Sequence, residues 1–222
     1  MAFLAKPGVP QLMALIAILV VFSIMAPSFR QIATYSNIIV HSAILGVVAC
    51  GTTIVLISGG LDLSVGSIMA VSTVLVGTVL MSQLPIILAI LAGVGVGALC
   101  GLLNGAIIVS TGVPAFIVTM GMMGIAKGVS LIIGAGKDMS IFPKSFTMMG
   151  TGLQWPGIIL IACVLLIFFI LRRTRLGFNA YAIWGNSSVS RLSGVKVRRN
   201  QVIYRIIGGF LAGVAGVMYT PG

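Results

Sequence analysis

The chain has 222 residues, of which 59% are hydrophobic and only 7% are charged, and its mean hydropathy is +1.23. Such a composition excludes an ordinary water-soluble globular domain and is typical of an integral membrane protein. Two acidic residues against thirteen lysines and arginines give a net charge of +11. That charge alone would suit nucleic acid, but no basic face interleaved with aromatic residues accompanies it, so we expect no nucleic-acid partner.

Seven apolar segments come close to the roughly 20 residues that an α-helix needs to cross a bilayer. Their length and uniform hydrophobicity favour helices over barrel strands. In chain order the expected spans are 11–26, 37–58, 63–81, 85–110, 115–134, 155–171 and 202–219. The first is interpreted as a retained anchor rather than a signal peptide, since no clean cleavage site follows it. The predicted fold is an all-α integral membrane protein with about seven transmembrane helices.

The distribution of charge predicts how these helices cross the membrane. Eight of the thirteen cations fall in one stretch that follows the sixth apolar segment: Arg172, Arg173, Arg175, Arg191, Lys196, Arg198, Arg199 and Arg205. By the positive-inside rule this region is a cytoplasmic loop, where it would also meet acidic membrane lipid. Six crossings return the chain to its starting side, so we expect a cytoplasmic N-terminus and an external loop at 135–154.

Asp62 lies between two long apolar segments, in the run GGLDLSVGS at 59–67. A carboxylate near hydrocarbon costs about 2.5–3.5 kcal/mol on insertion scales, so it normally faces a partner, a helix end or a water-filled path. One role for Asp62 is the N-cap of the next helix, with Ser64 and Ser67 hydrogen-bonded in the same turn. The other is a place in a solute pathway, because broken backbone at membrane depth is tolerated where it lines a cavity.

Glycines recur within two of the predicted helices. Gly97, Gly101 and Gly105 are four residues apart and share one helical face, where another backbone can approach closely. The last predicted span carries a similar set, namely Gly208, Gly209, Gly213 and Gly216. We expect both sets to be packing surfaces. Asn104 lies beside the first set, and its carboxamide needs hydrogen-bond partners, which are either another helix or a polar substrate.

The residues that usually carry metal binding or catalysis are few and scattered. Cys50, Cys100 and Cys163 lie far apart in apolar segments, and His41 is the only histidine. We therefore expect neither a disulfide framework nor a metal site. A membrane-embedded enzyme is the least favoured function, because two carboxylates and one histidine make a poor catalytic cluster. The chain has no glycine-rich phosphate loop with Lys-Ser/Thr, so ATP hydrolysis would belong to another chain.

Three runs of sequence resemble the sugar-type permease subunits of ATP-binding-cassette importers, a group that includes the ribose, arabinose and xylose permeases. The first is GGLDLSVGS at 59–67, and the second is GVPAFIVTMG at 112–121, which is similar to the family's Pro-x-Phe-Ile-x-Thr segment. The third comprises RTRLG at 173–177, AIWGN at 182–186 and RLSGV at 191–195. Their order and spacing match the family from about residue 37 to the end.

The resemblance implies a permease subunit that imports a monosaccharide or similar small polar solute across the bacterial cytoplasmic (inner) membrane. Its implied partners are two ATP-binding subunits, an extracytoplasmic solute-binding protein and a second permease subunit, identical or different. It implies no cofactor bound by this chain, since ATP is used by the partner. Family members run about a hundred residues further, so residues 1–222 are expected to form a single permease domain that is incomplete at its C-terminus and belongs to a larger bundle.

The resemblance also implies two sets of functional residues. The pathway or gate residues are Asp62, Ser64, Asn104, Phe116 and Thr119. The family's long cytoplasmic loop, here 172–201, docks onto the ATPase, and the coupling residues would be Gly185, Asn186, Ser187, Arg191, Leu192, Ser193 and Gly194. The sequence SSVS at 187–190 departs from the acidic or alanine-rich residues that are common there.

The chemistry of the loop supports the same interpretation independently. A short polar helix at 187–193 between basic flanks would fit a groove on a partner protein. We expect Leu192 to be its apolar anchor, Arg191 a polar contact, and Gly185 and Gly194 the points where the backbone turns. The alternative is that the basic residues only fix topology. For the whole chain, the alternative function is an ion-coupled secondary transporter that uses Asp62.

Overall fold

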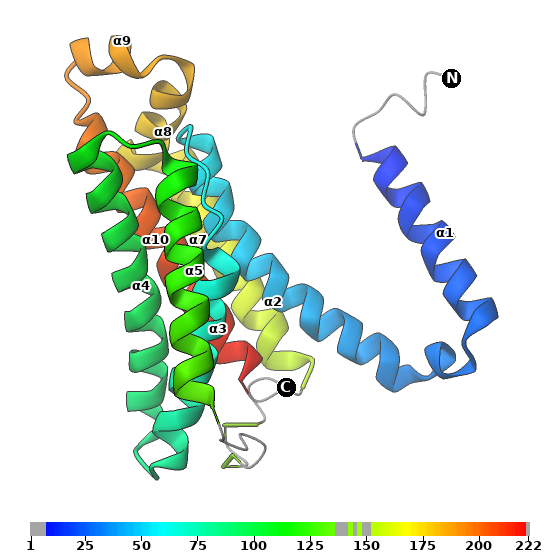
Figure 1. Cartoon of the computed structure of the whole chain (residues 1–222). Coiled ribbons are helices and arrows are strands. Elements are labelled where there is room, and N and C mark those ends of the chain that lie inside the picture. The colour runs from blue at the N-terminus through cyan, green and yellow to red at the C-terminus, as the bar shows by residue number, and fades with distance from the viewer. Residues whose placement is uncertain (1–7, 136–141, 144–145, 148–151, 221–222) are drawn as a thin grey trace. The chain divides into compact units, whose positions relative to one another are not determined.

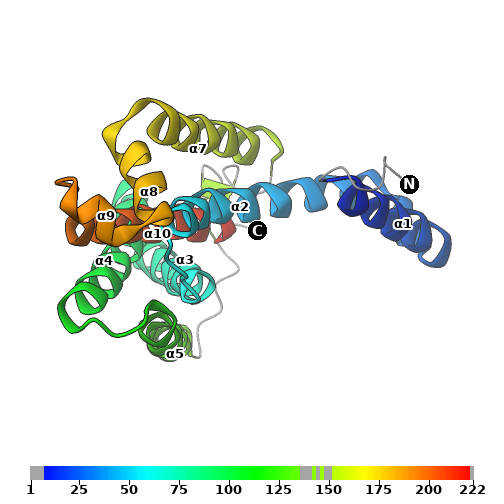
Figure 2. The same cartoon turned by 90° about the horizontal axis from the view of Figure 1, so that it is seen from above.

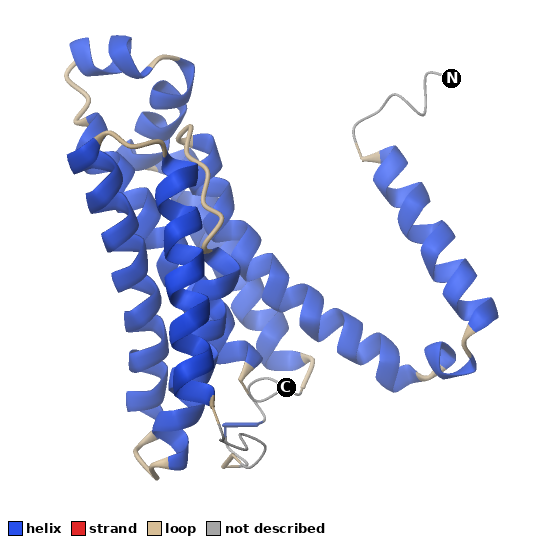
Figure 3. Cartoon of the chain, viewed as in Figure 1, coloured by secondary structure: helices blue, strands red, loops and turns tan. Residues whose placement is uncertain are grey.

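A computed structural model describes residues 8–135, 142–143, 146–147 and 152–220 of the chain. In this part of the chain the regular structure is helical, with turns and short loops between the helices (Figure 3). The elements are α1 (Val9–Met25), the 3-10 helix η1 (Pro27–Arg30), α2 (Ile32–Ile57), α3 (Val65–Met81), α4 (Ile86–Thr111), α5 (Ala115–Gly134), α7 (Gln154–Arg173), α8 (Arg175–Gly185), α9 (Ser187–Leu192) and α10 (Val197–Tyr219). The chain divides into two compact units, residues 1–39 and 40–222.

The first unit contains α1, η1 and the start of α2. Pro27 cannot continue a helix, and it begins the 3-10 turn η1 directly after α1. Phe29 of this turn stacks near Phe22 and Tyr35, with ring centroids 5.7 and 5.6 Å away. The Arg30 Nε donates to the Ser23 carbonyl oxygen at 2.6 Å. These local contacts fix the turn between α1 and α2.

The second unit is a bundle built around α10. Figure 2 looks along the bundle and shows α3 and α4 on one side of α10 and α7 on the other. In the most apolar stretch of α10 56% of the residues are buried, compared with 17% in α7. The exposed side chains of α7 are large and apolar, for example Leu165, Phe168 and Phe169. A helix that is apolar on its exposed face is suited to lipid.

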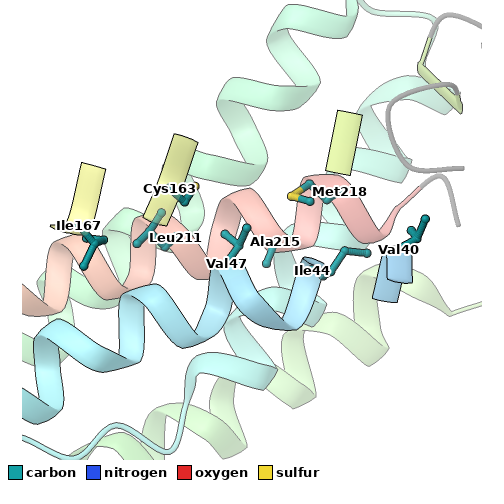
Figure 4. Packing of buried hydrophobic residues seen from close by; sticks show 8 residues of the cluster. All are labelled: Val40, Ile44, Val47, Cys163, Ile167, Leu211, Ala215 and Met218. Carbon is teal, nitrogen blue, oxygen red and sulfur yellow. The ribbon is translucent and has the colours of Figure 1, made fainter. Parts of the chain in front are cut away.

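An apolar cluster joins α10 to α2 and α7. Figure 4 shows Val40, Ile44 and Val47 of α2, Cys163 and Ile167 of α7, and Leu211, Ala215 and Met218 of α10 packed together. On this contact Gly51 of α2 lies against Gly208 of α10, whose Cα is 3.2 Å from the position of a Cβ at Gly51. The absence of a side chain at Gly51 therefore lets the two backbones approach closely.

The predicted glycine face of α4 packs against α10, where it meets Gly209 and Gly213 of the second set. A Cβ at Gly97 would overlap the carbonyl oxygen of Gly209, and one at Gly101 would overlap that of Arg205. At Gly105 it would lie 2.9 Å from the Cα of Val202. The prediction that these glycines form packing surfaces is confirmed.

All seven predicted apolar segments form helices, but not all of these helices have the length of a full membrane span. Within the described residues, five helices are long and apolar enough to cross a membrane by length and composition: α2, α4, α5, α7 and α10. The helices α1 and α3 are apolar but have 17 residues each, fewer than the roughly 20 of a full span. The expected number of about seven spans is thus confirmed for five. The multi-pass membrane character of the chain is clear from these five alone.

One expected boundary and the expected placement of one cation were wrong near the basic segment. The last helix begins at Val197 rather than at 202, so residues 197–201 of the expected loop 172–201 are helical. Arg205 was counted with the loop cations but lies in α10 with only 4% of its surface exposed. The expected external loop 135–154 lies largely outside the described residues.

Candidate functional site

The site begins where α2 ends. Gly59 adopts a left-handed conformation (φ 78°), and the Gly60 amide donates to the Val55 carbonyl oxygen at 3.0 Å. This is the hydrogen-bond pattern of a Schellman motif, which satisfies the last carbonyls of a helix and stops it. The chain then continues without helical structure as far as Ser64. Figure 1 shows this unwound segment (58–64, cyan) descending from the end of α2 to the start of α3.

Asp62 holds the unwound segment in shape. Its Oδ1 accepts hydrogen bonds from the backbone amide of Ser64 at 2.9 Å and from the Ser64 hydroxyl at 2.5 Å. An aspartate that accepts from the amide two residues on forms an Asx turn. The predicted hydrogen bonding of Ser64 in this turn is confirmed, but the predicted N-cap position of Asp62 was wrong, because α3 begins at Val65 and its N-cap residue is Ser64. The carboxylate instead stabilises the turn that leads into the helix.

Alternate residues of this segment face opposite ways. Asp62 and Ser64 are 6% and 0% exposed, whereas Leu61 and Leu63 are 45% and 40% exposed. In a water-soluble protein the leucines would be buried instead. Polar residues that face inward, with apolar residues outward, fit a segment that is surrounded by lipid or by an apolar partner surface.

Two neighbouring helices hold the segment through side chains. The Asn104 Nδ2 of α4 donates to the Ser64 hydroxyl oxygen at 2.9 Å, and the Leu63 amide donates to the Thr119 hydroxyl oxygen of α5 at 3.3 Å. Asn104 and Thr119 are both fully buried. The Asn104 Oδ1 is also buried and finds no hydrogen-bond partner among the described residues. Asp62, Ser64, Asn104 and Thr119 thus form a polar cluster inside an apolar bundle.

Phe116, the fifth predicted pathway residue, does not join the polar cluster. It lies in the first turn of α5 and its side chain is 46% exposed. Thr119, one turn further along α5, faces inward and donates to the Ala115 carbonyl oxygen at 2.9 Å.

Arg205 of α10 is the residue that the sequence interpretation missed. Its guanidinium is within electrostatic range of Asp62, and its Nη atoms lie 3.1 Å from where a Cβ would stand on Gly60. The sequence does contain an indication of this position, since Arg205 lies three residues inside the expected span 202–219. An arginine at that depth normally faces the bundle interior and marks a functional position.

The predicted coupling segment folds as two short helices, α8 and α9, at the end of the bundle where α4 ends (Figure 1). Asn186 caps α9, because its Oδ1 accepts from the amides of Ser188 and Val189 at 3.0 Å each. At the other end Gly194 is left-handed (φ 85°), and the Val195 amide donates to the Ser190 carbonyl oxygen at 3.0 Å. The helix is therefore closed at both ends by local hydrogen bonds.

The exposed face of this segment is apolar as well as basic. Leu192 is 89% exposed, and Phe178, Trp184 and Val189 are each more than half exposed. Ser187, Arg191 and Ser193 are exposed too, while Ser190 faces inward. The expected turn at Gly185 was wrong, because Gly185 is the last residue of α8 and the chain bends at the extended Asn186. Gly194 makes the expected turn.

Metal ligands do not gather anywhere in the described part of the chain. No group of three or more His, Cys, Asp or Glu residues is placed to hold an ion. Cys50, Cys100 and Cys163 are all free thiols in three different helices. The chemistry available at the polar cluster is hydrogen bonding and charge.

Comparisons with known proteins place these features in a family. A family model described as the permease component of branched-chain amino acid transport systems matches residues 34–222. The ribose import permease protein RbsC of Escherichia coli (strain K12) is 30% identical over 215 residues, which cover 93% of this chain and 67% of that protein. RbsC of Bacillus subtilis (strain 168) is 32% identical over 214 residues, covering 94% and 66%.

The galactofuranose transporter permease protein YtfT of Escherichia coli (strain K12) is 32% identical over 225 residues, covering 95% of this chain and 65% of that protein. The chain thus spans about two thirds of the length of the curated relatives it matches. No solved structure matches it significantly. The resemblance to sugar-type permeases is confirmed, and the comparisons give no support to an ion-coupled transporter.

Proposed function

This chain belongs to the permease-component family of branched-chain amino acid transport systems, and we propose that it is the permease subunit of an ATP-binding-cassette importer for a monosaccharide or similar small polar solute. It is a transport subunit and not an enzyme. The similar proteins named for ribose and galactofuranose favour a sugar over an amino acid as the solute. The working location is the bacterial cytoplasmic membrane.

The observation that carries this proposal is the polar cluster at the break between α2 and α3. Unwound backbone inside a membrane bundle is tolerated where it is enclosed by protein or lines a water-filled cavity. Solute sites of several transporter folds are built at such broken helices. The carboxamide of Asn104 and the hydroxyls of Ser64 and Thr119 are neutral groups that suit sugar hydroxyls, and Asp62 is the charged member of the cluster.

Energy would reach this chain by contact with separate ATP-binding subunits. The apolar, basic face of α8 and α9, including the exposed Leu192, is suited to a partner surface, since an apolar patch rimmed by polar residues marks an interaction site. A solute-binding protein and a second permease subunit complete the proposed importer. A second permease subunit would also cover part of the apolar helix surface that this chain leaves exposed.

The proposal includes membrane crossing by α1 and α3 as well. A helix of 17 residues is about 26 Å long, a few ångströms less than the roughly 30 Å of the hydrocarbon core. Local thinning of the bilayer accommodates a short helix at modest cost. For α3, the extended residues before Val65 supply further length.

The proposal is tested by uptake with two solutes and two energy sources. Cells that express the permease with its ATP-binding subunit and binding protein receive labelled ribose or labelled leucine. We expect ribose uptake that stops when ATP is depleted and persists after a protonophore. Uptake of leucine alone would reject the solute class, whereas uptake that depends on the proton gradient and survives ATP depletion would reject the importer mechanism.

A further inference from the structure

A pocket of about 320 Å³ lies where three parts of the bundle meet. Its walls come from residues 58–60 after α2, from Ile108 near the end of α4, from residues 112–115 leading into α5, and from Gln201 and Arg205 of α10. The volume is at the small end of the range for small-molecule sites, roughly 300–1,000 Å³. It is beside the polar cluster but has its own lining, to which Asp62 does not contribute.

Arg205 is the charged group of this pocket. Its side chain is 96% buried, and the Nε is buried without a hydrogen-bond partner among the described residues. Its two Nη atoms face Gly60, which also lines the pocket. A buried guanidinium with unused donors is matched by a ligand that brings oxygen acceptors, because its planar fork fits phosphate and carboxylate groups.

The first turn of α5 provides a second positive element. Pro114 precedes the helix, no side chain caps it, and its first turn contains no acidic residue. The first amide groups of an α-helix have no acceptor within the helix, and the helix dipole adds partial positive charge there. Ala115, the first residue of α5, lines the pocket together with Arg205. The start of α5 and the Arg205 side chain therefore border the same small space, and a helix N-terminus beside a cation favours an anion.

Asp62 does not accept a hydrogen bond from the Arg205 Nε. Its charge acts on Arg205, but its Oδ1 is engaged by the amide and hydroxyl of Ser64. The Nε of Arg205 remains without an acceptor.

We infer that this pocket binds a small oxyanion, through a phosphate or carboxylate group held by Arg205 and the amides at the start of α5. The inference goes beyond the proposed function, because an imported sugar is neutral and would not need this charge. The oxyanion comes either from a free small molecule or from a lipid headgroup, since both present the same oxygens.

The test uses inorganic phosphate and the full chain in nanodiscs of zwitterionic lipid, with binding measured by calorimetry at constant ionic strength. We expect saturable binding of one phosphate, weakened at least tenfold by Arg205→Gln. The matched control is Arg199→Gln, an exposed arginine of the same helix that does not line the pocket, and it should change the affinity less than twofold. Absence of phosphate binding by the unmodified chain would overturn the inference, as would equal binding by Arg205→Gln.

A second variant guards against misfolding of Arg205→Gln. Ala115→Asp places a carboxylate at the start of α5, where the helix dipole favours it, so the helical circular dichroism should be unchanged while phosphate binding is lost. Binding that survives in Ala115→Asp would contradict the site. Repeating the titration in nanodiscs that contain phosphatidylglycerol distinguishes the sources. Competition by this lipid assigns the site to a headgroup, and unchanged binding assigns it to a free oxyanion.

Discussion

Asp62 shows how one side chain serves local structure inside a membrane bundle. A single carboxylate oxygen holds both the amide and the hydroxyl of Ser64, and the same hydroxyl accepts from Asn104. The cluster is therefore a chain of dependent hydrogen bonds, in which loss of one member leaves other buried polar atoms unpaired.

Substitution separates this geometric role from the charge. Asp62→Asn keeps an oxygen acceptor toward Ser64 and should lower the free energy of unfolding by about 1 kcal/mol or less, whereas Asp62→Ala removes the acceptor and should cost about 1–3 kcal/mol. Thermal unfolding of the detergent-solubilised chain measures both. Equal stability of the two variants would show that the turn does not depend on Asp62. If Asn folds normally but uptake is lost, the charge itself is required.

The sequence predicted most of the site at this scale but not all of it. Asp62 and Asn104 stand out because each is polar in an apolar context, and Ser64 lies in the same short run as Asp62. Thr119 was named from the family resemblance. All four converge in the structure. Arg205 did not stand out, because it follows a run of basic residues and α10 begins earlier than its hydrophobicity indicates. The inward direction of Arg205 depends on how α10 packs against α2 and α4, which the pattern of one segment does not determine.

At the scale of elements, the packing of α4 on α10 depends on glycine. We predict that Gly101→Ala destabilises the chain by about 1–3 kcal/mol, because the new methyl group would overlap the backbone of Arg205. The matched control is Gly95→Ala in the same helix, where a Cβ meets nothing within 4 Å. That variant should be neutral or slightly stabilising, since alanine has the higher helix propensity. Similar unfolding temperatures for both variants would contradict the close contact.

The helix α9 leads to a prediction about partner binding. Leu192 is 89% exposed, so Leu192→Asp should leave folding and membrane insertion intact while weakening association with the ATP-binding subunit at least tenfold. Exposed apolar anchors of this kind carry much of an interface's energy. Ser188→Asp is the control, as it places the same charge in the first turn of α9, where the dipole tolerates it. Pull-down of the ATP-binding subunit measures the association of both variants. If the Leu192→Asp variant captures as much of the subunit as the unmodified chain, the segment serves only to fix the topology.

The existence of each helix followed from hydrophobicity, while helix ends and breaks did not. Segment 115–134 was predicted to the residue, because Pro114 marks its start. The break after α2 depends on a left-handed Gly59 and on contacts from α4 and α5, and such long-range contacts are not visible in the local pattern.

At the scale of the whole molecule, charge and crossing number predict orientation. The cations of 172–199 should keep α8 and α9 in the cytoplasm. A single cysteine at Ser188, in a background without Cys50, Cys100 and Cys163, should resist a membrane-impermeant thiol reagent in intact cells and react in inside-out vesicles. Strong labelling in intact cells would show that the topology is the reverse of the predicted one.

The proposed transport function requires that the polar cluster be part of the solute pathway rather than sealed packing. Ser64→Cys tests this most directly, in the same cysteine-free background and with the importer reconstituted in vesicles. Ser64 and Ser72 are both fully buried on either side of the start of α3, and Ser72 instead bonds the Gly213 carbonyl oxygen of α10 at 2.9 Å. We predict that a small water-soluble thiol reagent modifies Ser64→Cys during ATP turnover, that ribose slows the reaction, and that Ser72→Cys stays unmodified throughout. If the cysteines of Ser64→Cys and Ser72→Cys are equally protected from the reagent during ATP turnover, the polar cluster is not part of the solute pathway.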